Sequence, residues 1–412
     1  MRSPKLVGLL ATTAALALAL TACGGRAATT DAGAVPGITD TTVTIGSSFA
    51  LSGPLGANGT ASKGAALAYF ETVNAAGGVM MSDGKQRKIT FVYYDDAYTP
   101  AKAVQNYSKL VESDKVFSLF QTFGTATNLA IMKKANADGV PEAFVNAGDA
   151  VFSNDRTANP WTIGWQPTYA SEGVAYGKYL ASLGKPLTVA VLRQSDTLGD
   201  VYLHGLEEGV AGSQVTIAGV ESYSPTDATV DSQITNLAAT KADVLYLAAI
   251  PSVVGGAINH AFTLGWQPKV VIASVSSSIS QVIAPAKLTG YPELYSASFV
   301  KRADDPLWAN DPAVTTMTAQ MKRYAADANP MISNAPYTYA AAAALVEALK
   351  GMKTISRQGL MDSLNALKVD DIDILLPGLG VDGTNRTAPP VNGITLQHFE
   401  NGGWANLPAP GH

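Results

Sequence analysis

The sequence predicts an α/β protein with two similar lobes, each a doubly wound parallel sheet covered by helices. Short apolar runs typical of strands alternate with longer stretches of helical periodicity through most of the chain. The alternation comes in two series that meet near residue 165. Because a parallel connection needs a crossover, usually a helix, this rhythm indicates parallel sheets with helices on both faces.

The composition agrees with this fold class and narrows the function. The chain has 412 residues, of which 47% are hydrophobic and 15% charged, so two domains with sizeable cores are expected and disorder is excluded. Its net charge is −5 and it has no basic block, which argues against non-specific nucleic-acid binding. One cysteine excludes intrachain disulfides and thiolate zinc clusters, and the four histidines lie far apart. We expect neither a metal nor a cofactor.

The first series of elements runs from residue 43 to residue 145. Thr99 followed by Pro100 is a typical helix start, and Gly139 before Pro141 is a typical helix end. We expect strands at 43–49, 88–94, 116–121 and from 143, and helices at 62–74, at 100–112 and from about 125 to 139.

The second series follows Trp165 with the same rhythm. We expect helices at 171–183, 201–211, 230–239 and 253–264, and strands at 187–192, 214–220, 243–249 and 269–273. In an open parallel sheet, ligands bind beyond the carboxyl ends of the strands. The loops at those ends are rich in Gly, Ser and Thr and poor in titratable groups, which favours a hydrogen-bonding site over a catalytic one.

The N-terminus indicates export. Arg2 and Lys5 precede an apolar run at 7–22 that is shorter than the about 20 residues of a membrane span, as in a secretory signal peptide. The run ends in Leu20, Thr21, Ala22 and Cys23, which resembles a bacterial lipobox. That resemblance implies cleavage before Cys23 and lipidation of its thiol, followed by a flexible tether to residue 39; the alternative is an ordinary signal peptide with an incidental cysteine.

Several motifs together resemble solute-binding proteins of the branched-chain-amino-acid type. They are residues 49–54, 64–67 and 73–79, Asp95 and Asp96 with Pro100, and residues 103–104, 110–111, 140–141 and 243–244. The resemblance spans residue 40 to the C-terminus. It implies a type I periplasmic-binding-protein fold, in which three crossings form a hinge between the lobes. Lobe one would comprise 40–164 and 299–378, and lobe two 165–298 and 379–412.

The resemblance also implies a set of ligand-binding residues. Thr125, Ala126 and Thr127 match the position that holds a ligand carboxylate, where free N–H groups at a helix start favour an anion. Ala147, Gly148 and Asp149 match a second contact loop, and Tyr169 follows the first crossing. The alternatives are simple helix capping for the threonines and Asp149, and hinge packing for Tyr169.

Three positions of lobe two depart from the family pattern. Leu198, Ile250 and Val275 stand where relatives place a tyrosine, an aromatic residue and a glutamate that faces a ligand ammonium. An ordinary branched-chain amino acid is therefore a doubtful ligand. Asp149 could rescue such binding if its carboxylate turned into the cleft and paired with the ammonium.

These observations predict a lipid-anchored, extracytoplasmic, monomeric receptor that delivers a small solute to the permease and ATPase of an ABC importer. The solute would be an amino acid, an amide or another small carboxylate-like molecule. A ligand sensor that signals to a membrane partner is the alternative. We do not expect an enzyme: the sequence has no Gly-x-Ser-x-Gly elbow, and Asp95 and Asp96, adjacent at a strand end, point to opposite faces.

Overall fold

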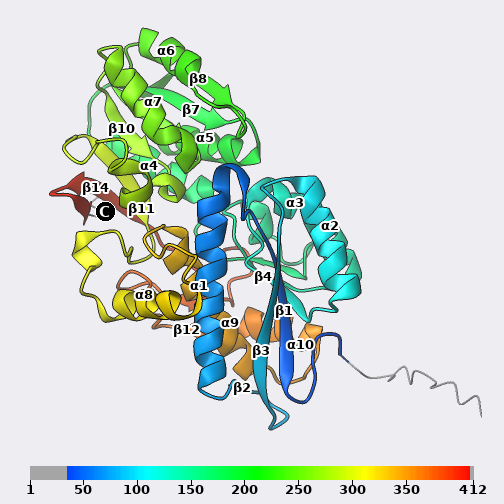
Figure 1. Ribbon diagram of the computed structural model, residues 1–412. Helices are drawn as coiled ribbons and strands as arrows, with labels where there is room; N and C mark the ends of the chain where they lie inside the picture. Colours follow the sequence, from blue (N-terminus) through cyan, green and yellow to red (C-terminus); the bar gives the residue numbers. More distant parts are fainter. Residues whose placement is uncertain (1–34, 409–412) are drawn as a thin grey trace, which may run out of the picture. The chain divides into compact units, whose positions relative to one another are not determined.

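Two β-sheets with helices on their faces organise residues 35–408, the part of the chain that the computed structural model describes (Figure 1). Each sheet has a parallel centre and forms one lobe. The predicted α/β class with two lobes is confirmed. The expected signal peptide, Cys23 and the tether up to residue 34 lie outside the described residues.

Lobe one contains a six-stranded sheet with the order β2-β3-β1-β4-β5-β6, parallel except for the pair β2 and β3. Its strands are β1 (Thr42–Phe49), β2 (Val79–Met80), β3 (Gln86–Asp95), β4 (Ser118–Phe120), β5 (Glu142–Val145) and β6 (Thr162–Gly164). Its helices are α1 (Gly56–Ala75), α2 (Pro100–Ser108), α3 (Thr125–Asp138), α8 (Pro312–Tyr324), α9 (Asn334–Gly351) and α10 (Arg357–Ala366). Two further short strands, β12 (Lys368–Val369) and β13 (Val381–Asp382), form a separate antiparallel pair.

Lobe two contains a seven-stranded sheet with the order β15-β14-β11-β10-β9-β7-β8, in which only β14 and β15 are antiparallel to their neighbours. Its strands are β7 (Leu187–Gln194), β8 (Val215–Tyr223), β9 (Val244–Ala248), β10 (Lys269–Ile272), β11 (Leu294–Ser298), β14 (Thr395–Glu400) and β15 (Gly403–Asn406). Its helices are α4 (Tyr169–Ser182), α5 (Thr197–Val210), α6 (Asp231–Ala239) and α7 (Pro251–Thr263).

The five central parallel strands follow the same order in both lobes. Numbered along the chain within each lobe, that order is 2-1-3-4-5: β3-β1-β4-β5-β6 in lobe one and β8-β7-β9-β10-β11 in lobe two. In this arrangement the chain changes direction between the first and third strands, and the loops after those two strands diverge. Each lobe therefore opens a crevice, between β1 and β4 in one and between β7 and β9 in the other.

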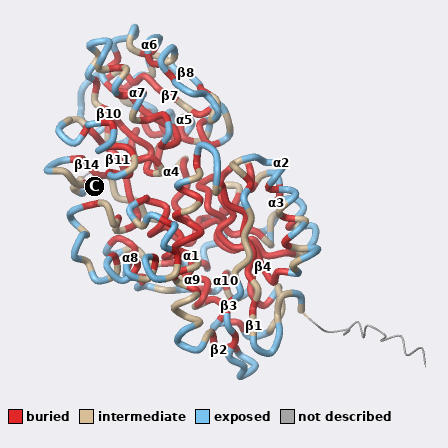
Figure 2. The backbone as a smooth tube through the Cα atoms, viewed as in Figure 1, coloured by how far each residue is buried: buried red, intermediate tan, exposed pale blue. Residues whose placement is uncertain are grey.

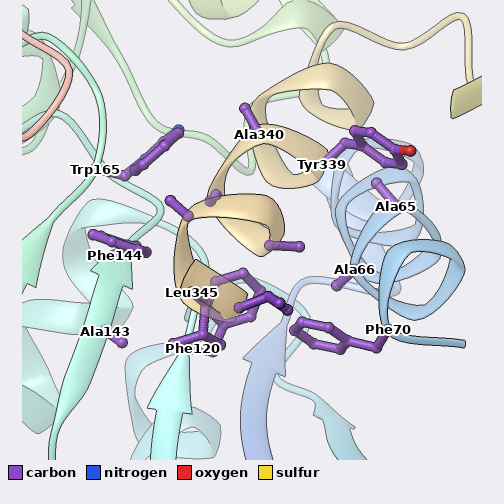
Figure 3. Close-up of a cluster of buried hydrophobic side chains, with 14 of the residues drawn as sticks. Ala65, Ala66, Phe70, Phe120, Ala143, Phe144, Trp165, Tyr339, Ala340 and Leu345 are labelled. Atoms are coloured by element: carbon purple, nitrogen blue, oxygen red, sulfur yellow. The ribbon is translucent and has the colours of Figure 1, made fainter. Parts of the chain in front are cut away.

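Alternating burial along the strands gives each sheet two apolar faces. Leu119 packs with Ala103 of α2 and Ile131 of α3, whereas its neighbour Phe120 belongs to the cluster that contains α1 and α9. Figure 3 shows that cluster, in which the alanine-rich helix α9 lies between the strands and α1. Figure 2 shows the buried backbone concentrated inside both lobes.

In lobe two, glycines bring α4 and α5 unusually close. A Cβ at Gly205 would lie 2.3 Å from the backbone oxygen of Ala170, and one at Gly173 would lie 2.6 Å from that of Tyr202. This contact packs the first turns of α4 against the middle of α5.

The chain crosses between the lobes after β6, after β11 and before β14. The last crossing comes later than the expected boundary at residue 379, because Val381 and Val391 are buried in the core of lobe one. At the other end, residues 35–39 are already attached to lobe one: the Thr44 N–H donates to Gly37 O at 2.7 Å, and Ile38 bridges to Val43. A flexible tether would therefore end before residue 35.

Two helices begin at least one turn earlier than their periodicity predicts. Helix α1 starts at Gly56 rather than 62, and α5 starts at Thr197 rather than 201, where the Asp196 carboxylate accepts the N–H groups of Leu198 and Gly199. Among residues 35–408, the helices are too short or too polar to cross a bilayer.

Candidate functional site

A cavity lies where the crevices of the two lobes face each other. It encloses ≈ 450 Å³ of space not filled by atoms, part of which is open to solvent. The loops after β1, β4, β7 and β9, which border the two crevices, all contribute to its wall. The residues that line it are Leu55, Asn58, Tyr98, Phe123, Gly124, Thr125, Asn146, Gln166, Tyr169, Leu198, Ile250, Pro251, Val275, Asn334 and Tyr337.

Thr125 begins α3 at the wall of this cavity. The preceding Gly124 has φ +96°, a conformation that favours glycine, and it provides no side-chain cap. The first N–H groups of a helix lack intrahelical acceptors, so this end presents free donors and the positive end of the helix dipole. The Thr125 hydroxyl is buried and makes no hydrogen bond of normal length and angle within residues 35–408, although it lies near the Tyr169 hydroxyl. This part of the wall suits an anion or a carbonyl oxygen.

Two more buried polar atoms of the wall lack partners within residues 35–408. They are Oε1 of Gln166, which lies in the first crossing, and the hydroxyl of Tyr337 on α9, which lies near the Ser274 side chain without a hydrogen bond of normal geometry. Buried polar groups in native proteins are nearly always hydrogen-bonded, so each such atom needs an explanation. Together with the Thr125 hydroxyl, three unpartnered groups from three separate elements line one cavity.

The carboxamides of the wall are tied to one another and to lobe two. The Asn58 Nδ2 donates to Asn334 Oδ1 at 2.8 Å and to Gln281 Oε1 at 3.3 Å. Gln281 belongs to the short helix η5 (Ile279–Ile283) of lobe two, and its Nε2 donates back to Asn58 Oδ1 at 2.9 Å. Asn58 thus lines the cavity and also joins the two lobes.

Lobe two contributes a mostly apolar wall. Leu198 lies in the first turn of α5, Ile250 precedes α7, and Val275 lies in a short 3-10 helix after β10. Tyr169 begins α4 and stacks on Tyr202, with ring centroids 4.6 Å apart. Burial raises the pKa of Tyr169 to about 12, so its hydroxyl remains protonated at neutral pH.

Five of the ten residues expected at the site line the cavity, namely Thr125, Tyr169, Leu198, Ile250 and Val275. The other five support it from behind or lie beside it. Thr127 turns its hydroxyl back to the carbonyls of Phe123 and Gly124, and Ala126 is half-buried next to it.

The loop at residues 147–149 lies outside the cavity wall. Ala147 is buried in a small apolar cluster. A Cβ at Gly148 would lie 2.5 Å from the ring of Tyr169, so only glycine leaves room for that ring. The Asp149 carboxylate caps a 3-10 turn by accepting the Val151 N–H at 2.9 Å, which is the capping alternative for this residue.

The acidic side chains near the cavity already accept hydrogen bonds from other groups of the protein. Glu172 is buried behind Tyr202 and accepts four hydrogen bonds, from the hydroxyls of Tyr176 and Tyr202 and from the N–H and hydroxyl of Ser274. Burial raises the pKa of Glu172, and that of Asp149 is raised by the same cause. Asp196 caps α5. No carboxylate is among the cavity-lining residues, so the described site offers no charged partner for an ammonium group.

Sequence reasoning missed most of the amide and tyrosine groups of the wall. Gln166 stands one residue after the predicted boundary at 165, and a polar residue at a crossing was a usable signal. Asn334 and Tyr337 open an otherwise alanine-rich helix that came after the last predicted element. Asn58 and Tyr98 lie in the loops at 50–59 and 95–99, which are among the strand-end loops expected to face a ligand, but neither residue stands out within its loop.

The adjacent acids at the end of β3 are hydrogen-bonded within the protein. Asp95 accepts hydrogen bonds from Leu51, Ser52 and Ala97, and Asp96 accepts them from Ser48 and Tyr98. Within residues 35–408, no three His, Cys, Asp or Glu side chains are grouped in a way that could hold a metal ion.

Residues 42–403 match the family model described as periplasmic binding protein. The chain belongs to the periplasmic binding protein family. The resemblance stated from the sequence motifs is confirmed, including the type I fold. Members of this family bind small solutes outside the cytoplasm, and the family is a binding class rather than an enzyme class.

Individual relatives are distant. A curated relative, the "Leu/Ile/Val-binding protein homolog 7" of Brucella suis biovar 1 (strain 1330), is 22% identical over 82% of this chain and 84% of its own length. A fatty acid ABC transporter substrate-binding protein from Thermomonospora curvata has a TM-score of 0.76 at 21% identity, over 91% of this chain and 93% of its own. A solute-binding protein from R. palustris in complex with benzoate has a TM-score of 0.73 at 17% identity, over 89% and 95%. These structures share the fold of this periplasmic binding protein.

Proposed function

We propose that this periplasmic binding protein captures a small solute in the cavity between its lobes and delivers it to an ABC importer. The observation that carries the proposal is the cavity itself, whose wall contains three buried, unpartnered polar groups. A ligand that hydrogen-bonds to these groups would remove their desolvation penalty, which is about 1–3 kcal/mol for each unsatisfied group. The solute is an amino acid, an amide or another small carboxylate-like molecule.

The arrangement of the wall supports a binding mode. The start of α3 and the Thr125 hydroxyl would hold the carboxylate or carbonyl group of the solute. Leu198, Ile250 and Val275 would contact its apolar part from the opposite lobe. Because a solute in this position contacts both lobes, it would favour the state in which they are closed on each other.

The relatives support a broad range of solutes for this fold. Their names include a homolog of a Leu/Ile/Val-binding protein, a fatty acid transporter component and a benzoate complex. Carboxylic acids are common to these names, which agrees with an anion-binding helix start. The apolar wall of lobe two is the reason to look beyond ordinary amino acids.

Membrane attachment through Cys23 is part of the proposal. The motif Leu20–Cys23 after an apolar run supports cleavage and lipidation at this cysteine. Replacing Cys23 with Ser should release the protein from the membrane fraction and abolish labelling by a fatty-acid probe. Unchanged labelling of the Cys23→Ser variant would contradict lipidation at this position.

An untargeted ligand search tests the binding function. The chain with Cys23→Ser is purified without denaturation, and small molecules that it retains are identified by mass spectrometry. We expect at least one small solute that stabilises the protein in a thermal-shift assay, since a ligand at 100 times its Kd adds about 2.7 kcal/mol. Thr125→Val should weaken this effect. If neither retained nor added solutes bind, the proposed function is wrong.

A further inference from the structure

The cavity wall separates donors from acceptors in a way that specifies a ligand class. The start of α3 offers N–H groups that can only donate, and the hydroxyls of Thr125 and Tyr337 can donate beside them. Such a cluster needs an acceptor, and a carboxylate is the strongest one that fits a helix start. The buried Gln166 Oε1 is different, because an amide oxygen can only accept. The ligand must therefore also supply a donor.

The donor that the ligand supplies must be uncharged. An ammonium group carries a charge and three N–H bonds and loses its hydration on entering the cavity, whereas the acceptors of the wall, Gln166 Oε1 among them, are uncharged carboxamide and hydroxyl oxygens. The acids that could neutralise it are already engaged: Asp149 caps residue 151 and Glu172 accepts four hydrogen bonds. A hydroxyl group donates one hydrogen bond without carrying a charge, so it suits the unpartnered Gln166 Oε1.

We propose that the ligand is a small hydroxy acid, with a carboxylate bound at Thr125 and the start of α3, a hydroxyl that donates to Gln166 Oε1, and an apolar body against Leu198 and Ile250. This assignment rests on the proposed solute-binding function and specifies its substrate. Gln166 is then the residue that selects the hydroxy acid over the amino acid of the same shape.

Matched sets of probes test this assignment directly. The aliphatic set is 2-hydroxy-4-methylpentanoate, 4-methylpentanoate and leucine, and the aromatic set is mandelate, phenylacetate and phenylglycine. Within a set the members differ only at one position, which carries a hydroxyl, a hydrogen or an ammonium. Calorimetry should show that in at least one set the hydroxy acid binds about tenfold more tightly than the deoxy acid and more than about 100-fold more tightly than the amino acid.

Two variants at one position separate recognition from folding. Gln166→Leu should remove the preference for the hydroxy acid over the deoxy acid while leaving deoxy-acid affinity within about threefold of wild type. Gln166→Glu introduces a carboxylate in the same shape and should shift the preference toward the amino acid. Retained affinity for the deoxy acid serves as the folding control, and Gln166→Met replaces Gln166→Leu if the latter fails to fold.

Three results would overturn the assignment: tightest binding of leucine or phenylglycine to the wild type, an unchanged hydroxy-acid preference in Gln166→Leu, or no binding in either set. The last result would leave the solute-binding function standing if the untargeted search finds another ligand. Failure of both experiments would refute the function itself.

Discussion

The two lobes share one strand order but differ in the polar groups that they present to the cavity. Besides the apolar Leu55 and Phe123, lobe one contributes the start of α3 with Thr125, the Tyr337 hydroxyl and the carboxamides of Asn58, Asn146 and Asn334. Lobe two contributes four apolar residues and the ring of Tyr169 from equivalent loops. The shared topology positions the loops that form the two sides of the cavity, whereas a few side chains on those loops determine which ligand groups each side binds. We infer that lobe one binds the polar head of the solute and lobe two its apolar body.

The largest effect is expected from placing a charge on the apolar wall. Val275→Glu would introduce a carboxylate that repels an acidic ligand across the cavity, and we expect affinity for such a ligand to fall by about 100-fold or more. Val275→Gln has a similar shape without the charge and is the matched control. Equal losses in the two variants, measured by calorimetry, would mean that shape rather than charge excludes the ligand.

Removing a polar group of lobe one should also weaken ligand binding strongly, although by less than a charge on the apolar wall. Thr125→Val deletes an unpartnered hydroxyl, and loss of a hydrogen bond to a charged group predicts about 10- to 100-fold weaker binding. Thr127→Val is the control, because the Thr127 hydroxyl already donates to the carbonyls of Phe123 and Gly124. An affinity loss in Thr127→Val that equals the loss in Thr125→Val would show that both act through helix α3 rather than through the ligand.

A moderate effect is expected where the lobes meet. Gln281→Leu breaks the reciprocal amide pair with Asn58 without changing a cavity-lining residue. Two neutral hydrogen bonds predict a dissociation rate about 5- to 30-fold faster, with little change in the association rate. Asn259→Ala removes an exposed carboxamide of the same lobe and should leave both rates unchanged. A slower association in Gln281→Leu, with an unchanged dissociation rate, would refute the role of this pair in holding the lobes closed.

The smallest effect on ligand affinity is expected from replacing one buried carboxylate in each lobe. These replacements should instead change the stability of the protein. Glu172 of lobe two has four donors, whereas Glu142 of lobe one receives one hydrogen bond, from Thr162, and its Oε1 has no partner among the described residues. Burial raises the pKa of Glu142 to about 8 from 4.5. Between these two values the unfolded chain loses the proton that the folded chain keeps, so the free energy of unfolding falls as the pH rises.

Glu142→Gln removes this dependence. At pH 8 the variant should be more stable than the wild type by about 4 kcal/mol, with equal stability near pH 4 and unchanged ligand affinity. Glu172→Gln should instead lose about 1–3 kcal/mol, because an amide N–H₂ would face the donors that the carboxylate accepts. Chemical denaturation at several pH values measures both, and a destabilised Glu142→Gln at pH 8 would contradict the protonated state of Glu142.

The sequence was sufficient for the parts of the molecule that follow local rules. Alternating periodicity predicted most strands and helices of residues 43–273, and the family resemblance led to Thr125, Tyr169, Leu198, Ile250 and Val275. Helix starts were harder to predict: the Asp196 carboxylate caps α5, which begins about one turn before its apolar pattern.

The missed residues depend on contacts between distant segments. Asn58 and Gln281 are 223 positions apart, and Tyr337 reaches the cavity because α9 packs against α1 in the core of lobe one. Local periodicity contains no information about such pairs. The same holds for Asp149, whose choice between capping and ligand binding is made by the geometry of the Val151 N–H.

A crystal structure of the protein with bound 2-hydroxy-4-methylpentanoate tests the division of labour between the lobes most directly. We predict that the carboxylate lies at the start of α3 within hydrogen-bond distance of the Thr125 hydroxyl, and that the branched chain contacts Leu198 and Ile250. A carboxylate bound at the lobe-two wall, with the alkyl chain against Thr125, would contradict the account.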